Sequence, residues 1–443
     1  MVKAHVLVLV CVFGAAVAAN ASVIDVNWDG SGDYATIQEA VDAAGPGDTL
    51  LVAAGTYSGS LNREISFSGK DVYLVSEDGA ESTIIDCGNA GRAFVVASGE
   101  GPDLIIEGFT IRNGYGSDDI GPERWGGAIY CAYSYCTVLK CHFEDCDAGY
   151  GGAIYAGISA IMDIISCEFE GNTADSYGGS IYTYASDVEI AKCDFYDGWA
   201  GINGGAVCCK TGTLVAISTC DFIGNSSAQG GAVYIGTFDN GGTEPEDPSE
   251  IYVCNFRHNT AMNGGAVFIN GFTWVNAAGC EFDYNTATGN GGAIFALTDY
   301  SRALTVQNCT FCFNGADHGG GVYAAGVFGF QMNVENSIFA FGEGGASVQA
   351  EDYGTVSVRY CIAFGNRGGD DFPGNSPTNF DLDPLFCDVF NGNYYHCSNS
   401  PCLPSIHPYG RPVGAHYYEY TTCGDCASPV EEASWGSIKA MYR

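Results

Sequence analysis

A short glycine-rich element recurs along the middle of the chain at intervals of about 27 residues, which is the signature of a repeat architecture. It reads Gly-Gly, a small residue, an aliphatic residue and, in most copies, an aromatic one, as in Gly-Gly-Ala-Ile-Tyr at 126–130. One such unit cannot bury an apolar face alone, so neighbouring units must stack. The repeat therefore overrides the division into about three domains that the length alone suggests. The element begins at Gly126, Gly151, Gly178, Gly204, Gly230, Gly264, Gly291 and, more loosely, Gly319.

A second element, Cys-x-Phe, lies between the glycine pairs and predicts β-strands. Its middle residue is polar in every copy and both neighbours are apolar, which is the period-two alternation of a half-buried strand. We expect the Cys and Phe side chains to point inward and the middle side chain to point to solvent. The middle residues are His142, Glu168, Asp194, Asp221, Asn255, Glu281 and Thr310.

These short strands, separated by glycines and without helical periodicity, predict an all-β fold: a single-stranded right-handed parallel β-helix. Eleven or twelve coils at about 4.8 Å each would form a rod about 55 Å long. A β-propeller needs about 40–45 residues per blade, and the shorter period argues against it. The glycine pairs are expected at corners with positive φ. An Asn three residues after the Phe is expected to form a hydrogen-bonded ladder at Asn172, Asn225, Asn259, Asn285 and Asn314.

The first end of the rod is predicted to carry a short N-terminal cap helix. Thr36 and Glu39 have the spacing of a capping box, and Gly45-Pro46-Gly47 breaks the helical pattern. We expect one continuous strand over Leu104–Ile111 further along. The apolar face of the cap helix contains Ile37, Ala40, Val41 and Ala44.

Four segments are predicted from these patterns. Residues 1–21 form a signal peptide, with Lys3 before the apolar run Val6–Val17. Residues 22–371 form the right-handed parallel β-helix, 372–426 a Cys-containing terminal module, and 427–443 a tail that includes a possible sorting peptide. No other stretch approaches the length of about 20 apolar residues that a membrane span needs. We expect a secreted or cell-surface protein without an integral membrane span after signal removal.

The charge of the chain excludes several partners. Lys and Arg total 16 against 52 Asp and Glu, which gives a net charge of −36. Such a field repels phosphate backbones and anionic headgroups, so nucleic acid and acidic membrane surfaces are not expected to bind. Hydrophobic residues make up 47% of the chain, enough to form a large core.

The 21 cysteines leave 20 once Cys11 departs with the signal peptide. The interior column is expected to contain free thiols, since buried Cys behaves as a small apolar residue, although cross-coil disulfides are an alternative. Cys397/Cys402 and Cys423/Cys426 are expected to form disulfides. No matching second pair supports zinc binding at 423–426. The column consists of Cys141, Cys167, Cys193, Cys220, Cys254, Cys280 and Cys309.

Three stretches resemble known families. The Gly-Gly-Ala-Ile and Phe-x-x-Asn elements over 126–322 resemble the repeats of chlamydial polymorphic outer-membrane proteins, which implies a β-helix with a role in adhesion. The opening Asp29–Val41 is similar to the start of pectin methylesterases and other pectin-lyase-like folds, but the motifs Gln-Asp-Thr-Leu and Asp-Phe-Ile-Phe-Gly are missing. Asp383–Phe386 with Ser400–Cys402 and Gly414-Ala415 resembles the closing segment of secreted bacterial right-handed parallel β-helix repeat proteins.

Candidate catalytic residues are few. Asp118 and Asp119 lie between Arg112 and Arg124 and could form the acid and base cluster of a calcium-assisted lyase, whereas the plainer interpretation is a solvated turn. Gly368–Asp371 is similar to a hydrolase Gly-Asp-Asp motif but lacks the other motifs of that family. An acidic run at 244–250 is interpreted as a solvated loop, with a weak Ca²⁺ site as the alternative.

An aromatic column follows the glycine pairs. If the preceding aliphatic residues point inward, alternation sends these rings outward, where they would form a platform for sugar faces. With the opposite phase, or without a ligand, they pack among themselves. The predicted carbohydrate-binding residues are Tyr130, Tyr155, Tyr182, Tyr234 and Tyr323, with Phe268 and Phe295 in the same column and Cys208 replacing one ring.

The sequence therefore predicts an exported, non-catalytic β-helix protein that acts in adhesion, carbohydrate binding or scaffolding. A polysaccharide or cell-surface glycan is the expected partner, with Ca²⁺ as the candidate cofactor. The alternative is a polysaccharide lyase or glycoside hydrolase acting on an acidic polysaccharide.

Overall fold

The computed structural model describes residues 21–117, 124–210, 214–236, 248–271, 273–298, 304–326, 330–351, 354–374, 376–416, 422–424 and 426. Nearly all of the predicted signal peptide, the predicted tail 427–443, most of the acidic run, and both Asp118 and Asp119 lie outside this range. Within it, no helix has the length and hydropathy to cross a membrane.

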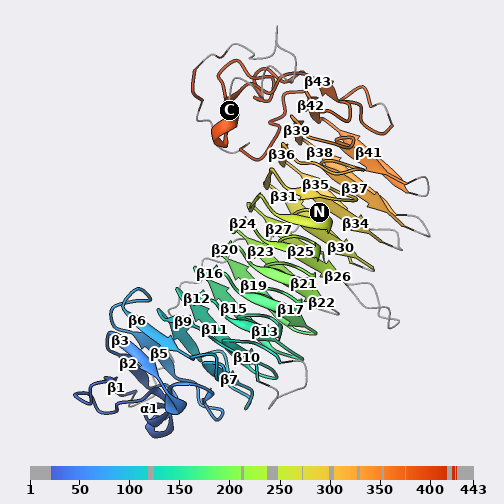
Figure 1. Ribbon diagram of the computed structural model, residues 1–443. Coiled ribbons are helices and arrows are strands. Elements are labelled where there is room, and N and C mark those ends of the chain that lie inside the picture. The colour runs from blue at the N-terminus through green and yellow to red at the C-terminus, as the bar shows by residue number, and fades with distance from the viewer. Residues whose placement is uncertain are drawn as a thin grey trace.

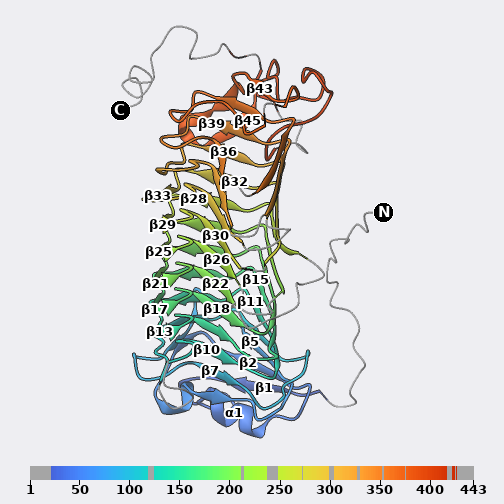
Figure 2. The same ribbon diagram turned by 90° about the vertical axis from the view of Figure 1, so that its right-hand side faces the viewer.

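The chain forms an all-β, right-handed parallel β-solenoid of about 12 turns, as the repeat predicts. The strands stack as rungs along a rod (Figure 1). The cap helix α1 (Ile37–Ala43) lies at one end, and the turn-rich segment after β43 lies at the other (Figure 2). Two short 3-10 helices are η1 (Ser60–Asn62) and η2 (Val389–Asn391).

Sheet A is one of two 13-stranded sheets, and all its strand pairs are parallel. In spatial order it contains β1 (Val23–Val26), β2 (Thr49–Val52), β5 (Tyr73–Ser76), β8 (Ile105–Glu107), β11 (Tyr135–Leu139), β15 (Ile161–Ile165), β19 (Asp187–Ala191), β23 (Leu214–Ser218), β27 (Ser249–Tyr252), β31 (Val275–Ala278), β35 (Leu304–Gln307), β38 (Gln331–Glu335) and β41 (Thr355–Arg359).

Sheet B is the second 13-stranded parallel sheet and contains the Cys-x-Phe elements. Its order is β3 (Gly55–Ser58), β6 (Thr83–Asp86), β9 (Thr110–Arg112), β12 (His142–Glu144), β16 (Glu168–Glu170), β20 (Asp194–Tyr196), β24 (Asp221–Ile223), β28 (Asn255–Arg257), β32 (Glu281–Asp283), β36 (Thr310–Cys312), β39 (Ile338–Ala340), β42 (Ile362–Phe364) and β43 (Phe380–Asp381).

Sheet C has 11 parallel strands and follows the glycine pairs. Its order is β4 (Ile65–Ser66), β7 (Phe94–Val96), β10 (Ile129–Cys131), β14 (Ile154–Ala156), β18 (Ile181–Tyr184), β22 (Val207–Lys210), β26 (Val233–Gly236), β30 (Val267–Asn270), β34 (Ile294–Leu297), β37 (Val322–Ala325) and β40 (Val348–Ala350).

Sheet D is shorter, with six strands between sheets B and C along the chain. A separate antiparallel pair, β44 (Phe386–Asp388) and β45 (Asn393–His396), lies in the segment after β43. Sheet D contains β13 (Asp147–Tyr150), β17 (Thr173–Tyr177), β21 (Trp199–Asn203), β25 (Ser226–Gln229), β29 (Thr260–Asn263) and β33 (Thr286–Ala287).

The inward residues of sheet B form continuous columns, which confirms the predicted alternation. The Phe rings from Phe143 to Phe339 stack with centroids 4.6–4.9 Å apart, close to the strand spacing of a sheet. The Asn ladder also forms: Asn259 Nδ2 donates to Asn285 Oδ1 at 3.0 Å, and Asn285 Nδ2 donates to Asn314 Oδ1 at 3.0 Å. These amides satisfy buried backbone groups that water cannot reach.

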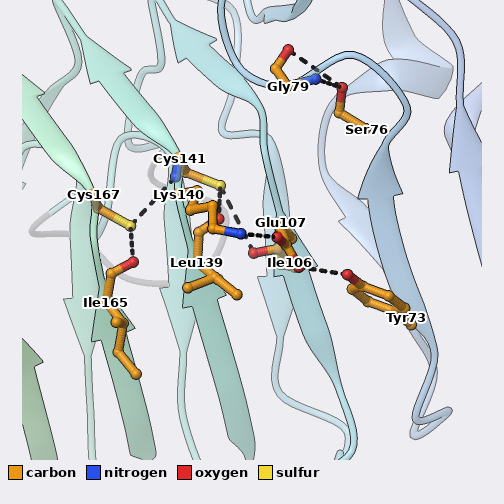
Figure 3. A network of polar contacts seen from close by, with 10 residues as sticks. All are labelled: Tyr73, Ser76, Gly79, Ile106, Glu107, Leu139, Lys140, Cys141, Ile165 and Cys167. Carbon is orange, nitrogen blue, oxygen red and sulfur yellow. Dashed lines mark hydrogen bonds and ion pairs between the residues drawn. The ribbon is translucent and has the colours of Figure 1, made fainter. Parts of the chain in front are cut away.

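The interior cysteines are free buried thiols, as expected. Each forms polar contacts with the backbone: Cys141 Sγ lies 3.8 Å from the Ile106 carbonyl and 3.5 Å from that of Leu139 (Figure 3). The Cys141 amide points to Cys167 Sγ at 3.5 Å, so each thiol links its own coil to the preceding one. A hydroxyl performs this role at Ser337, whose Oγ accepts from the Cys309 amide at 3.2 Å.

The glycine pairs lie at corners of the coil, as predicted. Gly151 has a φ of +65°, a conformation that side chains disfavour. Gly152 has a different requirement, because a Cβ there would lie 2.0 Å from the Gly179 carbonyl oxygen of the next coil. The pair therefore supplies one left-handed turn and one close approach between coils.

Two local predictions are wrong in detail. The capping box does not form: Thr36 Oγ1 donates to the Glu39 carboxylate at 2.6 Å, while the first helical amide, of Ile37, donates to Asn62 Oδ1 at 2.9 Å. The single strand over Leu104–Ile111 is divided into β8 and β9, because Gly108 turns the chain with a φ of +79°.

The terminal cysteines pair differently from the prediction. The disulfides are Cys387–Cys423 and Cys397–Cys426, whereas Cys402 is a free buried thiol. Cys402 lies instead in the apolar cluster, shared with Val389 and Tyr394, through which the terminal segment packs against the rod.

Candidate binding face on sheet B

The outward face of sheet B carries two register-matched columns of side chains, most of which are polar in the middle of the rod. The middle residue of each Cys-x-Phe element forms the first column, and the residue two positions later forms the second, because side chains alternate along a strand. We call the open part of this face the acidic strip, defined by His142, Glu144, Glu168, Glu170, Asp194 and Asp221.

Three ligand-type side chains meet on strands β12 and β16. One ligand atom from each of His142, Glu168 and Glu170 lies within 4.8 Å of the other two. His142 Nε2 is 3.7 Å from Glu170 Oε2. That nitrogen is shielded from solvent and has no hydrogen-bond partner among the described residues. Both glutamates are exposed, so this group can accept a divalent cation together with further ligands from solvent or a partner.

The next two coils add Asp194 and Asp221, which are register partners on adjacent strands. Partial burial, followed by the charges of Asp221 and Glu168, raises the pKa of Asp194 to about 6. Asn255 Nδ2 donates to Asp221 Oδ1 at 2.6 Å. Carboxylates therefore follow one another along the strip at the spacing of the coils.

An ion pair borders the strip on each side. Arg112 contacts Asp86 at 2.9 Å, two coils before Glu168. Arg257 contacts Glu281 at 3.3 Å on the other side. Both guanidinium groups are therefore paired with carboxylates outside the acidic strip. They do not neutralise the strip, which keeps an excess of negative charge.

The predicted tyrosine platform is not exposed in the structure. Ile129 and Ile154 belong to the main core, so the aromatic side chains do point away from it, but a second buried cluster encloses them. Trp125, Tyr150 and Tyr177 pack against this cluster. Little ring area is left for a sugar to stack on, since the exposed fractions are 3–8% for Tyr130, Tyr155, Tyr182, Tyr234 and Tyr323.

Lys210 occupies the space beside Cys208, where the aromatic column lacks a ring. Its Nζ lies 3.2 Å from the ring centroid of Tyr177 and 5.6 Å from that of Tyr234. Burial lowers the pKa of Lys210 to about 8. The cation–π contacts explain how a lysine with 1% exposure is accommodated here.

The predicted lyase cluster is only partly described. Arg124 is bound to Asp147 at 2.9 Å and Asp175 at 2.6 Å, on sheet D, whereas Arg112 is bound to Asp86 on sheet B. The two arginines therefore belong to different ion pairs on different sheets. Asp118 and Asp119 lie outside the described residues.

Asp370 of the Gly-Asp-Asp sequence closes a turn. Its carboxylate accepts hydrogen bonds from the Gly365 amide at 3.1 Å and the Asn366 amide at 3.0 Å. A cavity of about 200 Å³ next to it is lined by Asp371 and Asp381 among others. The hydrogen bonds give Asp370 a structural role.

The acidic strip was not singled out from the sequence, although its signal was present. The middle residues of consecutive Cys-x-Phe elements are His142, Glu168, Asp194 and Asp221, which stacking brings into one column. Alternation along each strand predicts only that these side chains face solvent, and the register of the coils is what aligns them.

Comparisons with solved structures give distant similarities. XylC, solved in complex with xylose, shares 9% identity over 82% of this chain and 87% of that chain, with a TM-score of 0.46. The PL6 family alginate lyase AlyGC shares 11% identity over 83% and 54%, with a TM-score of 0.43. Pectin methylesterase from carrot shares 13% identity over 84% and 91%, with a TM-score of 0.29.

No curated protein sequence matches the chain. A family model described as "Right handed beta helix region" matches residues 127–311, which is the part where both repeated elements are regular.

Proposed function

We propose that this protein is an exported, non-catalytic binding rod that holds divalent cations on the acidic strip and, through them, an acidic polysaccharide. The observation that carries the proposal is the meeting of His142, Glu168 and Glu170 ligand atoms within 4.8 Å on adjacent coils. The raised pKa of Asp194 supports it, because burial and then the charges of Asp221 and Glu168 disfavour its ionised form, which a bound cation would stabilise.

The charge of the chain explains why a cation is needed. A protein with a net charge of −36 repels a polyanion at long range. Ca²⁺ accepts six to eight oxygen ligands, so carboxylates of Glu168, Asp194 and Asp221 can fill part of its shell while the polymer and water fill the rest. The rigid parallel stacking repeats the carboxylates coil by coil, which suits a linear polymer.

Titration calorimetry with CaCl₂ tests the cation site directly. We expect the triple variant E168Q/D194N/D221N to lose about tenfold or more in Ca²⁺ affinity, since each change removes a charged ligand. The matched control E77Q/D78N/E81Q removes the same charge from exposed positions away from the strip and should change the affinity less than about twofold. Equal losses in both variants would overturn the assignment.

Co-elution with polygalacturonate in size-exclusion chromatography tests whether bound cations link the protein to an acidic polysaccharide. We expect the protein to elute with the intact polymer in Ca²⁺ and to separate from it in EDTA. Binding that persists unchanged in EDTA would contradict cation bridging.

A retaining glycoside hydrolase is the second candidate, because Asp194 and Asp221 are paired on adjacent strands. Their backbones are about 4.8 Å apart, and retaining enzymes hold two carboxyl groups at about 5–5.5 Å. With its pKa at about 6, Asp194 would protonate the leaving oxygen while Asp221 attacks the anomeric carbon. A gain of reducing ends from polygalacturonate that D194N abolishes would favour this function over the binding rod.

A further inference from the structure

The segment after β43 folds back over the far end of the sheet B face. We call residues 386–416 the cover. Val389, Tyr394 and Val413 of the cover pack into one apolar cluster with the outward-facing Ile338 and Ile362 of the rod. Chain segments distant in sequence therefore meet here, and the outward face of the last coils is closed to solvent.

Two hydrogen bonds anchor the cover on the rod. The Ala415 amide donates to Thr310 Oγ1 at 3.0 Å, and the Gly414 amide donates to the Asn336 carbonyl at 2.9 Å. A Cβ on Gly414 would lie 2.6 Å from Ile338 Cδ1, so a small residue is needed at this contact.

Two carboxylates lie beneath the edge of the cover. Glu281 and Asp283 on β32 are 5% and 4% exposed. His416 Nε2 contacts Glu281, and the Tyr394 hydroxyl faces Asp283. Neither Asp283 Oδ1 nor the Tyr394 hydroxyl completes a hydrogen bond of good geometry within the described residues. The pair continues the two columns of the acidic strip, one coil beyond Arg257.

We propose that the cover is a pH-sensitive lid over this second acidic segment, Glu281 and Asp283, and that its contact with the rod loosens as the pH rises through neutrality. Deprotonation of Asp283 would place a second anion beside Glu281 in a contact from which water is excluded, which costs free energy.

The direction of the pH effect follows from burial. Burial raises the pKa of Asp283 from 3.8 to about 7, while the Tyr394 hydroxyl and Arg257 act in the opposite direction. The closed form binds the proton of Asp283 more tightly than the open form does. This stabilisation of the closed form is fully present below about pH 4, where Asp283 is protonated in the open form as well. It declines as the pH rises through about 7.

Other titratable groups face the contact from each element packed on it. Burial raises the pKa of the Cys312 thiol and of the Tyr394 hydroxyl, so both stay neutral at physiological pH. Burial and the nearby His416 lower the pKa of His396 to about 4, so its imidazole is also neutral. Of these four shifted pKa values, that of Asp283 is the one near neutral pH. The remaining polar neighbours are Arg257 on β28, Glu281 on β32, Tyr284, Cys402 and His416.

Hydrogen exchange of the full chain, with its disulfides intact and EDTA present, tests the lid. After correction for intrinsic rates, we expect the opening constant reported by the Gly414 and Ala415 amides to rise about tenfold between about pH 6 and about pH 8. The EDTA keeps this test independent of cation binding, so failure of the proposed function would leave it standing.

The variant D283N separates the lid from general loosening at high pH. Its neutral amide should remove the pH dependence, whereas the control D388N, at an exposed position of the same hairpin, should retain it. An opening constant in the wild-type protein that does not change with pH would overturn the proposal without any variant. So would a D283N protein, folded by circular dichroism, with undiminished pH dependence.

Discussion

At the residue scale, small groups solve the problem of packing one coil on the next. Gly152 admits the Gly179 carbonyl oxygen, the Asn ladder satisfies buried amides, and the thiol column satisfies others at the turn from sheet A to sheet B. Each is a contact between residues at the same position of successive coils. A side chain that adds volume at such a position must displace backbone rather than another side chain.

The substitution Gly152→Ala is therefore expected to destabilise the rod by about 1–3 kcal/mol, because the new methyl group meets backbone that cannot move aside. The midpoint of urea unfolding measures this effect. Gly45→Ala is the matched control: the nearest atom to its Cβ would be an Asp48 carboxylate oxygen at 3.6 Å, and its unfolding midpoint should hardly change. Similar losses in both variants would show that the carbonyl contact is not the cause.

At the scale of elements, sheet B performs two tasks with one alternating pattern. Its inward residues form the Phe and Cys columns, and its outward residues form the acidic strip. The thiols of the inner column are buried in the core. Burial raises the pKa of Cys254 and of Cys309, which disfavours the reactive thiolate at these two residues.

Thiol titration with Ellman's reagent tests that inner column. In the native protein we expect fewer than about one of the 16 free cysteines in the described part of the chain to react, because burial keeps the reagent from their thiols. After unfolding in guanidinium without reductant, all of them should react. A deficit of thiols in the unfolded protein would mean that disulfides join neighbouring coils, the alternative that the sequence left open.

At the scale of the whole molecule, the two ends of the rod are closed by different devices. The helix α1 buries Ile37, Ala40 and Val41 against the first coils. The cover closes the far end and also occupies the outward face of sheet B, where Ile338 and Ile362 take the positions that are acidic in the middle of the rod. An uncovered apolar sheet face is a site of association.

Removal of residues 383–443, which keeps β43, is therefore expected to make the rod self-associate. Light scattering should show a mass of a dimer or larger for the truncated chain and a monomer for the same truncation carrying Ile338→Lys and Ile362→Lys. A monomeric truncated chain without these changes would show that the cover is not needed to shield this face.

The class of fold and the columns inside the rod could be predicted from the local pattern of residues alone. The positions of Cys141, Phe143 and their equivalents alternate locally and recur at one period, so stacking them requires no knowledge of distant contacts. For the same reason the inward thiols and the Asn ladder were predictable. The candidate site was only half predictable: the outward direction of Glu168 and Asp194 followed from alternation, but their gathering into one strip required the register of the coils.

Which outward faces stay open to solvent depends on contacts between distant parts of the chain. The tyrosine column points away from the main core, yet Tyr150 and Tyr177 cover it. Residues 310 and 415, which are 105 positions apart, meet where the cover lies on sheet B, and the same fold-back brings Cys387 to Cys423 rather than Cys402 to Cys397. Such contacts depend on the course of long segments that do not repeat. The strand alternation and the coil repeat do not specify that course.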